Sequence, residues 1–288
     1  MPVEAWILAF GSAWLFGQGL VLTQFALKHT TPALGAAISM PTAALVFWLS
    51  APFLATFEGW DSDAALLFLV IGIFFPGAIT LLTFEANRLM GPYVSGALGN
   101  LAPLFAVVAA VLVLGETLDG LQAAAIAIIV LGVSGLSLRR DWNDGVWRHW
   151  AMMLPLGAAF LRGVGPPLLK IGLAWWPNPF VAVMLCYLAS ATVGITVGLL
   201  RTRGRERRVT RMGVFWYASV GLSNGFAVMF WIMALALGPV SLISPVVACY
   251  PVVTLLLGAI FLRRAQIGVQ HVAGVALTVL GVVLLVTA

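Results

Sequence analysis

The sequence predicts an all-α integral membrane protein with ten transmembrane helices, built as two inverted five-helix repeats. Three observations support this prediction. The 288 residues are 62% hydrophobic and only 9% charged, whereas an ordinary soluble domain is about one quarter charged. Long runs of the chain contain no Asp, Glu, Lys or Arg. Segments of the first half recur in the second half at an offset of 146 to 149 residues.

The uncharged runs place the helices in order, because a bilayer core about 30 Å thick requires roughly 20 apolar residues per helix. The sixth helix carries Arg162 and Lys170, and the run 212–262 is long enough for two helices, separated by the turn signal "LALGPVS" at 235–241. We expect no soluble domain, since the connections are short. The expected helices lie within residues 5–27, 29–57, 64–84, 89–115, 120–138, 149–174, 171–200, 212–262 (two helices) and 265–288.

Lysine and arginine indicate the orientation. The connections after helices 1, 3, 5, 7 and 9 hold 13 of the 15 basic residues, including the run "RTRGRERRVTR" at 201–211. The connection after helix 2 is acidic. Basic loops stay in the cytoplasm, so we expect both termini in the periplasm and a bacterial inner-membrane location.

The internal repeat divides the chain into residues 1–140, a cytoplasmic linker at 141–148, and residues 149–288. "AWLFGQG" at 13–19 matches "AFLRGVG" at 159–165, and "IIVLGVSGL" at 128–136 matches "LTVLGVVLL" at 277–285. Five is odd, so the second repeat crosses the membrane in the opposite sense to the first. Secondary transporters with inverted repeats place their substrate site near the membrane midplane, between the halves.

Several motifs resemble the drug/metabolite transporter superfamily, and within it the EamA-type exporters of amino acids and other metabolites. They are the Gly-Pro pairs at 91–92 and 238–239, the mid-helix prolines Pro103 and Pro251, and "LGET" at 114–117. The resemblance implies a central cavity lined mainly by helices 1, 3, 4, 6, 8 and 9. It also implies that helices 5 and 10 pack at the periphery.

Polar and aromatic side chains within the predicted helices are candidates for binding substrate. Arg162 is the sharpest candidate, because an arginine near the middle of the bilayer must face protein or water. We expect Pro166 and Pro167 to break the helix beside it. A buried structural contact is the alternative for Arg162, helix bridging for the amides, and packing for the aromatics. We expect Lys170 to reach the interface and Glu85 to pair with Arg88. The candidates are Trp14, Gln18, Asn100, Arg162, Asn224 and Tyr250.

The motifs of known enzymes and metal sites are missing from the sequence, so we expect no catalytic residues, no metal and no cofactor. The expected function is export of small metabolites, most of all amino acids, by a monomer that contacts membrane lipids and no nucleic acid. Two alternatives stay open: a multidrug or nucleobase-type exporter on the same scaffold, and a membrane-embedded enzyme or lipid-binding scaffold. Proton coupling would have to use Glu85, because the other carboxylates fall in termini or loops.

Overall fold

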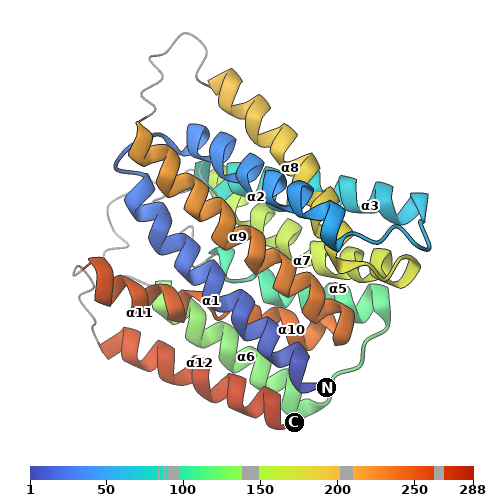
Figure 1. Cartoon of the computed structure of the whole chain (residues 1–288). Helices are drawn as coiled ribbons and strands as arrows, with labels where there is room; N and C mark the ends of the chain where they lie inside the picture. The colour runs from blue at the N-terminus through green and yellow to red at the C-terminus, as the bar shows by residue number, and fades with distance from the viewer. Residues whose placement is uncertain (84, 87–88, 90–97, 138–148, 202–209, 263–268) are drawn as a thin grey trace.

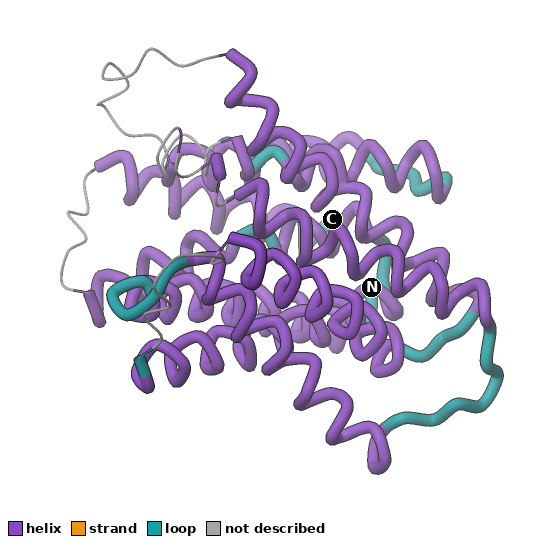
Figure 2. The backbone as a smooth tube through the Cα atoms, turned by 90° about the horizontal axis from the view of Figure 1, so that it is seen from above, coloured by secondary structure: helices purple, strands orange, loops and turns teal. Residues whose placement is uncertain are grey.

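In the computed structural model the chain is a bundle of α-helices, with both termini at the same end (Figure 1). The structure describes residues 1–83, 85–86, 89, 98–137, 149–201, 210–262 and 269–288. This described part is helix, turn and loop, without a strand (Figure 2). Its elements are α1 (Val3–Ala26), α2 (Pro32–Leu54), α3 (Ser62–Gly72), the π-helical turn η1 (Ile73–Ala78), α5 (Ala102–Leu114), α6 (Gly120–Ser137), the 3-10 turn η2 (His149–Met152), α7 (Met153–Trp175), α8 (Pro179–Arg201), α9 (Arg211–Leu237), α10 (Val240–Val247), α11 (Tyr250–Leu262) and α12 (Val269–Thr287).

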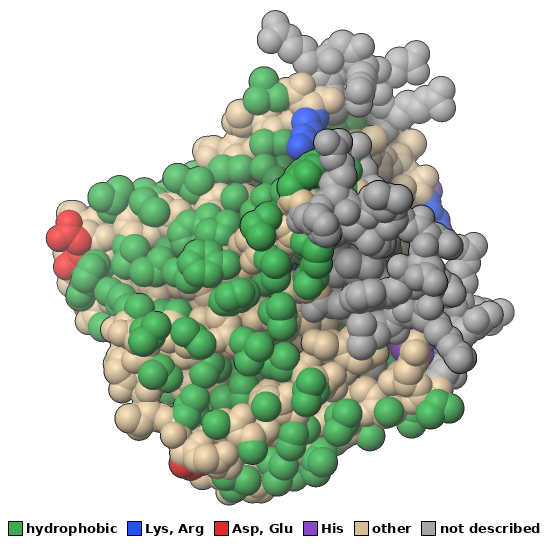
Figure 3. Space-filling view, turned by 180° about the vertical axis from the view of Figure 1, so that it is seen from behind, with side chains coloured by type: hydrophobic (Ala, Val, Ile, Leu, Met, Phe, Trp, Pro, Cys, Tyr) green, Lys and Arg blue, Asp and Glu red, His purple; other side chains and the backbone are tan. Residues whose placement is uncertain are grey.

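The described residues include eight helical segments that are long and apolar enough to cross a membrane. One of them, Ser62–Thr83, contains α3 and η1, and another, Val240–Phe261, contains α10 and α11. Two further apolar helices, Ala102–Leu114 and Gly120–Gly135, are shorter. The expected fourth helix includes residues 90–97, which lie outside the described residues. The expected linker, 141–148, also lies outside them. Hydrophobic side chains cover most of the face in Figure 3, as expected of a multi-pass membrane protein.

Capping side chains and glycine define several helix ends. The Asp61 carboxylate accepts a hydrogen bond from the Ala64 N–H at 2.8 Å, and the Thr210 hydroxyl accepts one from the Gly213 N–H at 3.0 Å. Both satisfy a backbone donor that the first helical turn leaves unpaired. Gly115 ends α5 with a φ of 66°, a left-handed conformation that side chains disfavour. The chain turns between α9 and α10 within residues 235–241, as the sequence predicts.

Small residues and hydroxyls hold α1 against α9. The Ser12 hydroxyl donates to the Ala227 carbonyl and the Ser223 hydroxyl donates to the Leu15 carbonyl, each at 2.8 Å. Gly19 touches the carboxamide of Asn224. Such interhelical hydrogen bonds and close backbone contacts usually stabilise helix pairs in a membrane, where the hydrophobic effect does not drive helices together.

The repeated glycines make equivalent contacts in the two halves. A Cβ on Gly17 would lie 2.8 Å from the Tyr250 carbonyl oxygen in α11, and one on Gly163 would lie 2.9 Å from the Ala102 carbonyl oxygen in α5. The helix pairs also correspond between the two halves: α1 packs on α9 and α11, and α7 packs on α3 and α5. α2 pairs with α8, and α6 with α12.

α6 and α12 pack along one edge of the bundle (Figure 1). Glycines on both helices let the backbones approach closely. A Cβ on Gly281 would lie 2.8 Å from the Ile129 nitrogen, and one on Gly132 would lie 2.6 Å from the Thr278 nitrogen. This pair is the peripheral one that the resemblance implies.

Prolines mark two helix breaks, and one expected break is absent. Pro103 and Pro251 each stand in the first turn of a helix that begins after a break, α5 and α11, and Pro251 lies within the membrane segment Val240–Phe261. Proline fits there because the first turn does not use its missing N–H. The expected break beside Arg162 is wrong, since α7 continues through Pro166 and Pro167. Both prolines are buried, so packing holds the helix together despite two lost hydrogen bonds.

Candidate functional site

A cavity of about 270 Å³ lies within the bundle, between side chains of the two halves of the chain. Its wall comes from α1, the third membrane segment, α5 with the turn before it, α7, α9, and α10 with α11. These are the helices that the resemblance implies, and α2 and Tyr187 of α8 also contribute. Within the described residues, α6 and α12 supply no lining side chain.

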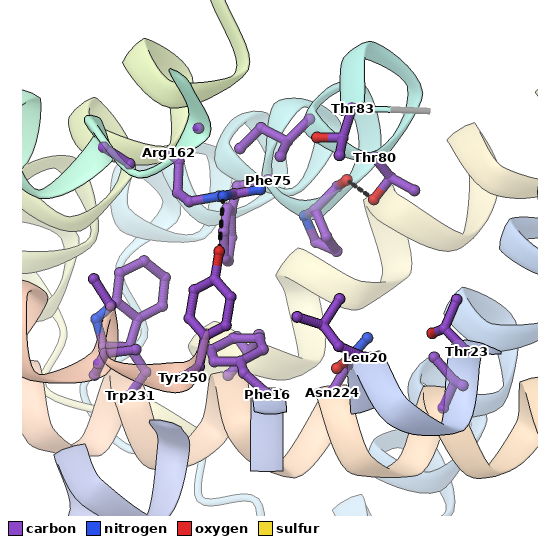
Figure 4. A pocket seen from close by; sticks show the side chains of 18 of the residues that line it. Phe16, Leu20, Thr23, Phe75, Thr80, Thr83, Arg162, Asn224, Trp231 and Tyr250 are labelled. Atoms are coloured by element: carbon purple, nitrogen blue, oxygen red, sulfur yellow. Dashed lines mark hydrogen bonds between the residues drawn. The ribbon is translucent and has the colours of Figure 1, made fainter. Parts of the chain in front are cut away.

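Arg162, Tyr250 and Phe16 converge in this cavity (Figure 4). The Arg162 Nη1 donates to the Tyr250 hydroxyl at 3.5 Å, a weak contact that is longer than the usual 2.7–3.2 Å of an N–H···O hydrogen bond. Phe16 packs beside the Tyr250 ring, with 6.3 Å between ring centroids. Phe16 and Arg162 occupy equivalent places in the repeated sequence, so the two halves bring different side chains to the same tyrosine.

Arg162 gives the cavity its charge. No other Lys, Arg, Asp or Glu lines the cavity among the residues that the structure describes. In that same part of the chain, Tyr250 is the one hydrogen-bond partner of its guanidinium, which carries five N–H donors. An unpaired charge inside a membrane protein is costly and marks a functional position. Arg162 therefore has donors available for a ligand.

A stripe of polar side chains on α9 also faces the cavity. Tyr217, Asn224 and Trp231 are spaced by seven residues, so they recur every two turns on one face of the helix. The Tyr217 hydroxyl, the Trp231 Nε1 and the Ser244 hydroxyl are buried without a hydrogen-bond partner. Buried polar groups normally have partners, so these three enclosed atoms lack the hydrogen bonds that burial usually requires. Tyr217, Trp231 and Ser244 were not predicted from the sequence, although the spacing of seven was a detectable signal.

The two helix breaks open toward the cavity at equivalent positions. Asn100 precedes α5, and Ala248 precedes α11; both line the wall. The Asn100 amide donates to the Val133 carbonyl of α6 at 3.1 Å, so this side chain also bridges helices.

Two of the six predicted site residues lie elsewhere. Trp14 is 50% exposed on the outside of the bundle, and Gln18 is partly buried but does not line the cavity. Both belong to α1, whose other face supplies Phe16, Leu20 and Thr23 (Figure 4). The remaining four, Asn100, Arg162, Asn224 and Tyr250, share the cavity wall.

Two other charged residues form contacts outside the cavity. The Lys170 ammonium donates to the carbonyls of Leu235, at 2.6 Å, and Gly238, at the turn that follows α9. Glu85 pairs with Arg201 at 3.7 Å, whereas its expected partner Arg88 lies outside the described residues. Neither Lys170 nor Glu85 lines the cavity.

The described residues hold no group of three or more His, Cys, Asp and Glu side chains that could bind a metal ion. The chemistry available in the cavity is therefore recognition by a guanidinium, hydroxyls, an indole N–H and aromatic faces. That inventory suits reversible binding of a small molecule.

The EamA-like transporter family matches residues 4–138 and again residues 149–287. The chain belongs to the EamA-like transporter family. One relative is the probable 4-amino-4-deoxy-L-arabinose-phosphoundecaprenol flippase subunit ArnE of Proteus mirabilis (strain HI4320), which is 31% identical over 75 residues. That match spans 26% of this chain and 66% of ArnE.

A solved crystal structure has the same fold as this EamA-like chain. Its TM-score is 0.80 at 19% sequence identity, over 99% of this chain and 96% of the other. Identity at this level supports the fold alone. The family match identifies the protein as a membrane transporter and supports the resemblance to the drug/metabolite transporter superfamily.

Proposed function

We propose that the protein is a secondary transporter that exports small metabolites, most of all amino acids with aromatic or apolar side chains. The observation that carries the proposal is Arg162, a cation that faces an apolar cavity without an ion-pair partner among the described residues. A guanidinium can hold a carboxylate through two parallel hydrogen bonds. The aromatic rings of Phe16, Phe75 and Trp231 suit an apolar side chain.

Ten membrane helices in two inverted five-helix repeats are part of this proposal. The equivalent contacts of Gly17 and Gly163 support it, as does the pairing of α1 with α9 and α11 beside that of α7 with α3 and α5. A two-fold relation between the halves would produce these matched pairs. Such a scaffold transports by rocking one half against the other around a central site, which is the alternating access that we propose.

The location and orientation that we propose rest on charge. On the face shown in Figure 3, the Asp and Glu side chains in view lie toward one end of the molecule and the Lys and Arg side chains in view lie toward the other. By the positive-inside rule the basic end faces the cytoplasm. We therefore propose a bacterial inner-membrane protein with periplasmic termini. We further propose that it works as a monomer, surrounded by lipid and without nucleic acid.

The energy source that we propose is the substrate gradient. Proton antiport usually needs a carboxylate inside the membrane whose protonation follows transport. The described cavity wall has none, and Glu85, at the end of the third membrane segment, is bound to Arg201. Facilitated diffusion is thus the proposed mode, with Glu85 as the route of coupling if protons move.

A second candidate function comes from the likeness to ArnE, which is named as a flippase subunit for a lipid-linked amino sugar. A cavity of about 270 Å³ is small beside the 300–1,000 Å³ of typical ligand pockets. It fits an amino acid or a nucleobase more readily than a sugar joined to a long lipid. A multidrug or nucleobase-type exporter on the same scaffold is the other alternative.

Transport by the purified protein tests the proposal. Proteoliposomes are loaded with labelled amino acids of different side chains, and their release is compared with that from liposomes without protein. We expect protein-dependent release, fastest for phenylalanine and other apolar amino acids. Absence of release for the whole panel, with release of a lipid-linked sugar or a nucleobase instead, would overturn the amino-acid assignment.

A further inference from the structure

We propose that the cavity recognises the carboxylate and the apolar body of its substrate but not the ammonium group. Organic monoanions should then bind at least as tightly as zwitterionic amino acids with the same side chain. This inference rests on the proposed function, and it extends the substrate class from amino acids to their deaminated acids.

Charge is the first argument. Arg162 is the one charged side chain in the cavity wall that the structure describes. Two carboxylates beside the membrane helices are engaged elsewhere: Glu116 accepts hydrogen bonds from the backbone at the start of α10, and Glu85 pairs with Arg201. Neither lines the cavity. A substrate ammonium would therefore lose its hydration near a guanidinium, without a described carboxylate to compensate it.

The unpartnered polar atoms are the second argument. The side chains of Trp231 and Tyr217 are only 4% and 2% exposed, and that of Ser244 is 8% exposed, yet each has a buried polar atom without a partner. The indole N–H of Trp231 can only donate, and the two hydroxyls can donate as well as accept. The guanidinium of Arg162, whose hydrogen bond among the described residues is the one to Tyr250, faces the same cavity and brings charged donors to it. An oxygen-rich anion is the complementary ligand.

The apolar wall is the third argument, because it favours binding of an acid with a phenyl group over binding of a simple inorganic anion. Phe75 and Trp231 lie with 5.0 Å between ring centroids, and Phe16 packs beside Tyr250. Figure 4 shows these rings gathered around the contact between Arg162 and Tyr250. A ligand with its carboxylate at Arg162 can place an aromatic ring among them.

Three ligands with the same phenyl body separate the two charged groups: 3-phenylpropionate, L-phenylalanine and phenethylamine. Their dissociation constants are measured on the purified wild-type protein in detergent, so this comparison needs no variant. We expect 3-phenylpropionate to bind as tightly as phenylalanine or more tightly. We expect phenethylamine to bind at least about tenfold more weakly, since it lacks the group that Arg162 holds.

Variants test whether the named atoms are responsible. Arg162→Gln should weaken binding of 3-phenylpropionate at least about tenfold, and Trp231→Phe should weaken it several-fold, because the ring stays and the donor is lost. Lys28→Gln is the matched control: it removes an exposed positive charge from the turn after α1, at a residue that does not line the cavity. It should leave the dissociation constant unchanged.

Three results would overturn the inference. They are equal binding of phenethylamine and 3-phenylpropionate, phenylalanine binding more than tenfold tighter than the acid, and binding of none of the three ligands. Release of labelled phenylalanine from proteoliposomes is measured separately and reports on the proposed function. Preference for the acid without phenylalanine transport would support the inference while contradicting the proposed function. Transport of phenylalanine together with tighter binding of phenethylamine than of 3-phenylpropionate would support the proposed function while contradicting the inference.

Discussion

Glu116 connects the two halves of the chain at the end that we assign to the periplasm. Its Oε1 accepts a hydrogen bond from the Val240 N–H at 2.8 Å, and its Oε2 accepts one from the Ser241 N–H at 2.9 Å. Both donors belong to the first turn of α10, where a negative charge also interacts favourably with the helix dipole. Lys170 donates to the carbonyls of Leu235, in the last turn of α9, and of Gly238, two residues before α10 begins. Glu116 and Lys170 therefore stabilise the two sides of the turn between α9 and α10.

Replacing Glu116 should measurably destabilise the protein. A hydrogen bond to a charged group contributes about 1.5 to 3 kcal/mol, and the low end applies here because Glu116 is only partly buried. Glu116→Ala removes both bonds, so we expect a loss of about 3 kcal/mol. For a chain of this length that corresponds to a fall in melting temperature of about 5 °C. Glu116→Gln keeps one neutral acceptor and should lose about half as much.

Thermal unfolding of the purified protein in detergent measures this effect. Glu4→Gln is the matched control, because Glu4 is an exposed carboxylate at the start of α1, and it should shift the midpoint little. Lys170→Met should also lower the midpoint, and the double variant with Glu116→Ala should lose less than the sum, since both residues hold one turn. Midpoints within 1 °C of wild type for both Glu116 variants would refute the reasoning.

Three further predictions concern packing, the cavity and coupling. Gly281→Ala should lower the melting temperature by about 2 to 5 °C, because its Cβ would meet the backbone of α6 at 2.8 Å; Gly135→Ala, whose Cβ would lie 4.0 Å from the Gly274 Cα, is the control and should be neutral or stabilising. Gly19→Ala should displace the Asn224 carboxamide into the cavity and reduce phenylalanine release more than folded yield; equal losses would contradict this. Glu85→Gln should abolish any substrate-driven proton movement, measured with a pH-sensitive dye in the vesicles, and proton movement that survives the substitution would exclude Glu85 as the coupling residue.

Most of the membrane helices were predictable, because the membrane constrains both composition and length. A run of about 20 uncharged residues has few structures available to it other than a helix. The repeated glycines at 17 and 163 were also informative, since close helix packing requires a small residue at the same place in each half. Arg162 stood out for the same physical reason: a charge among apolar residues needs an explanation.

The direction of individual side chains was less predictable. In a membrane helix the lipid-facing side is as apolar as the packed side, so α1 carries no amphipathic signal to show that Trp14 faces outward and Phe16 inward. The effect of proline was also misjudged, because neighbouring helices hold α7 together through Pro166 and Pro167. The contact of Glu116 with Val240 joins residues 124 positions apart, and no local pattern in the sequence reports it.

Amino-acid release by Arg162 variants is the most direct test of the central claim, that this arginine holds the substrate carboxylate in the cavity. Wild type, Arg162→Lys and Arg162→Ala are reconstituted at equal folded amounts, and phenylalanine release is measured over a range of concentrations. We expect Arg162→Ala to reduce release at low substrate at least about tenfold. Arg162→Lys should raise the half-saturating concentration although it keeps the charge, because the planar fork is lost. Wild-type rates and half-saturation in a well-folded Arg162→Ala variant would contradict the account.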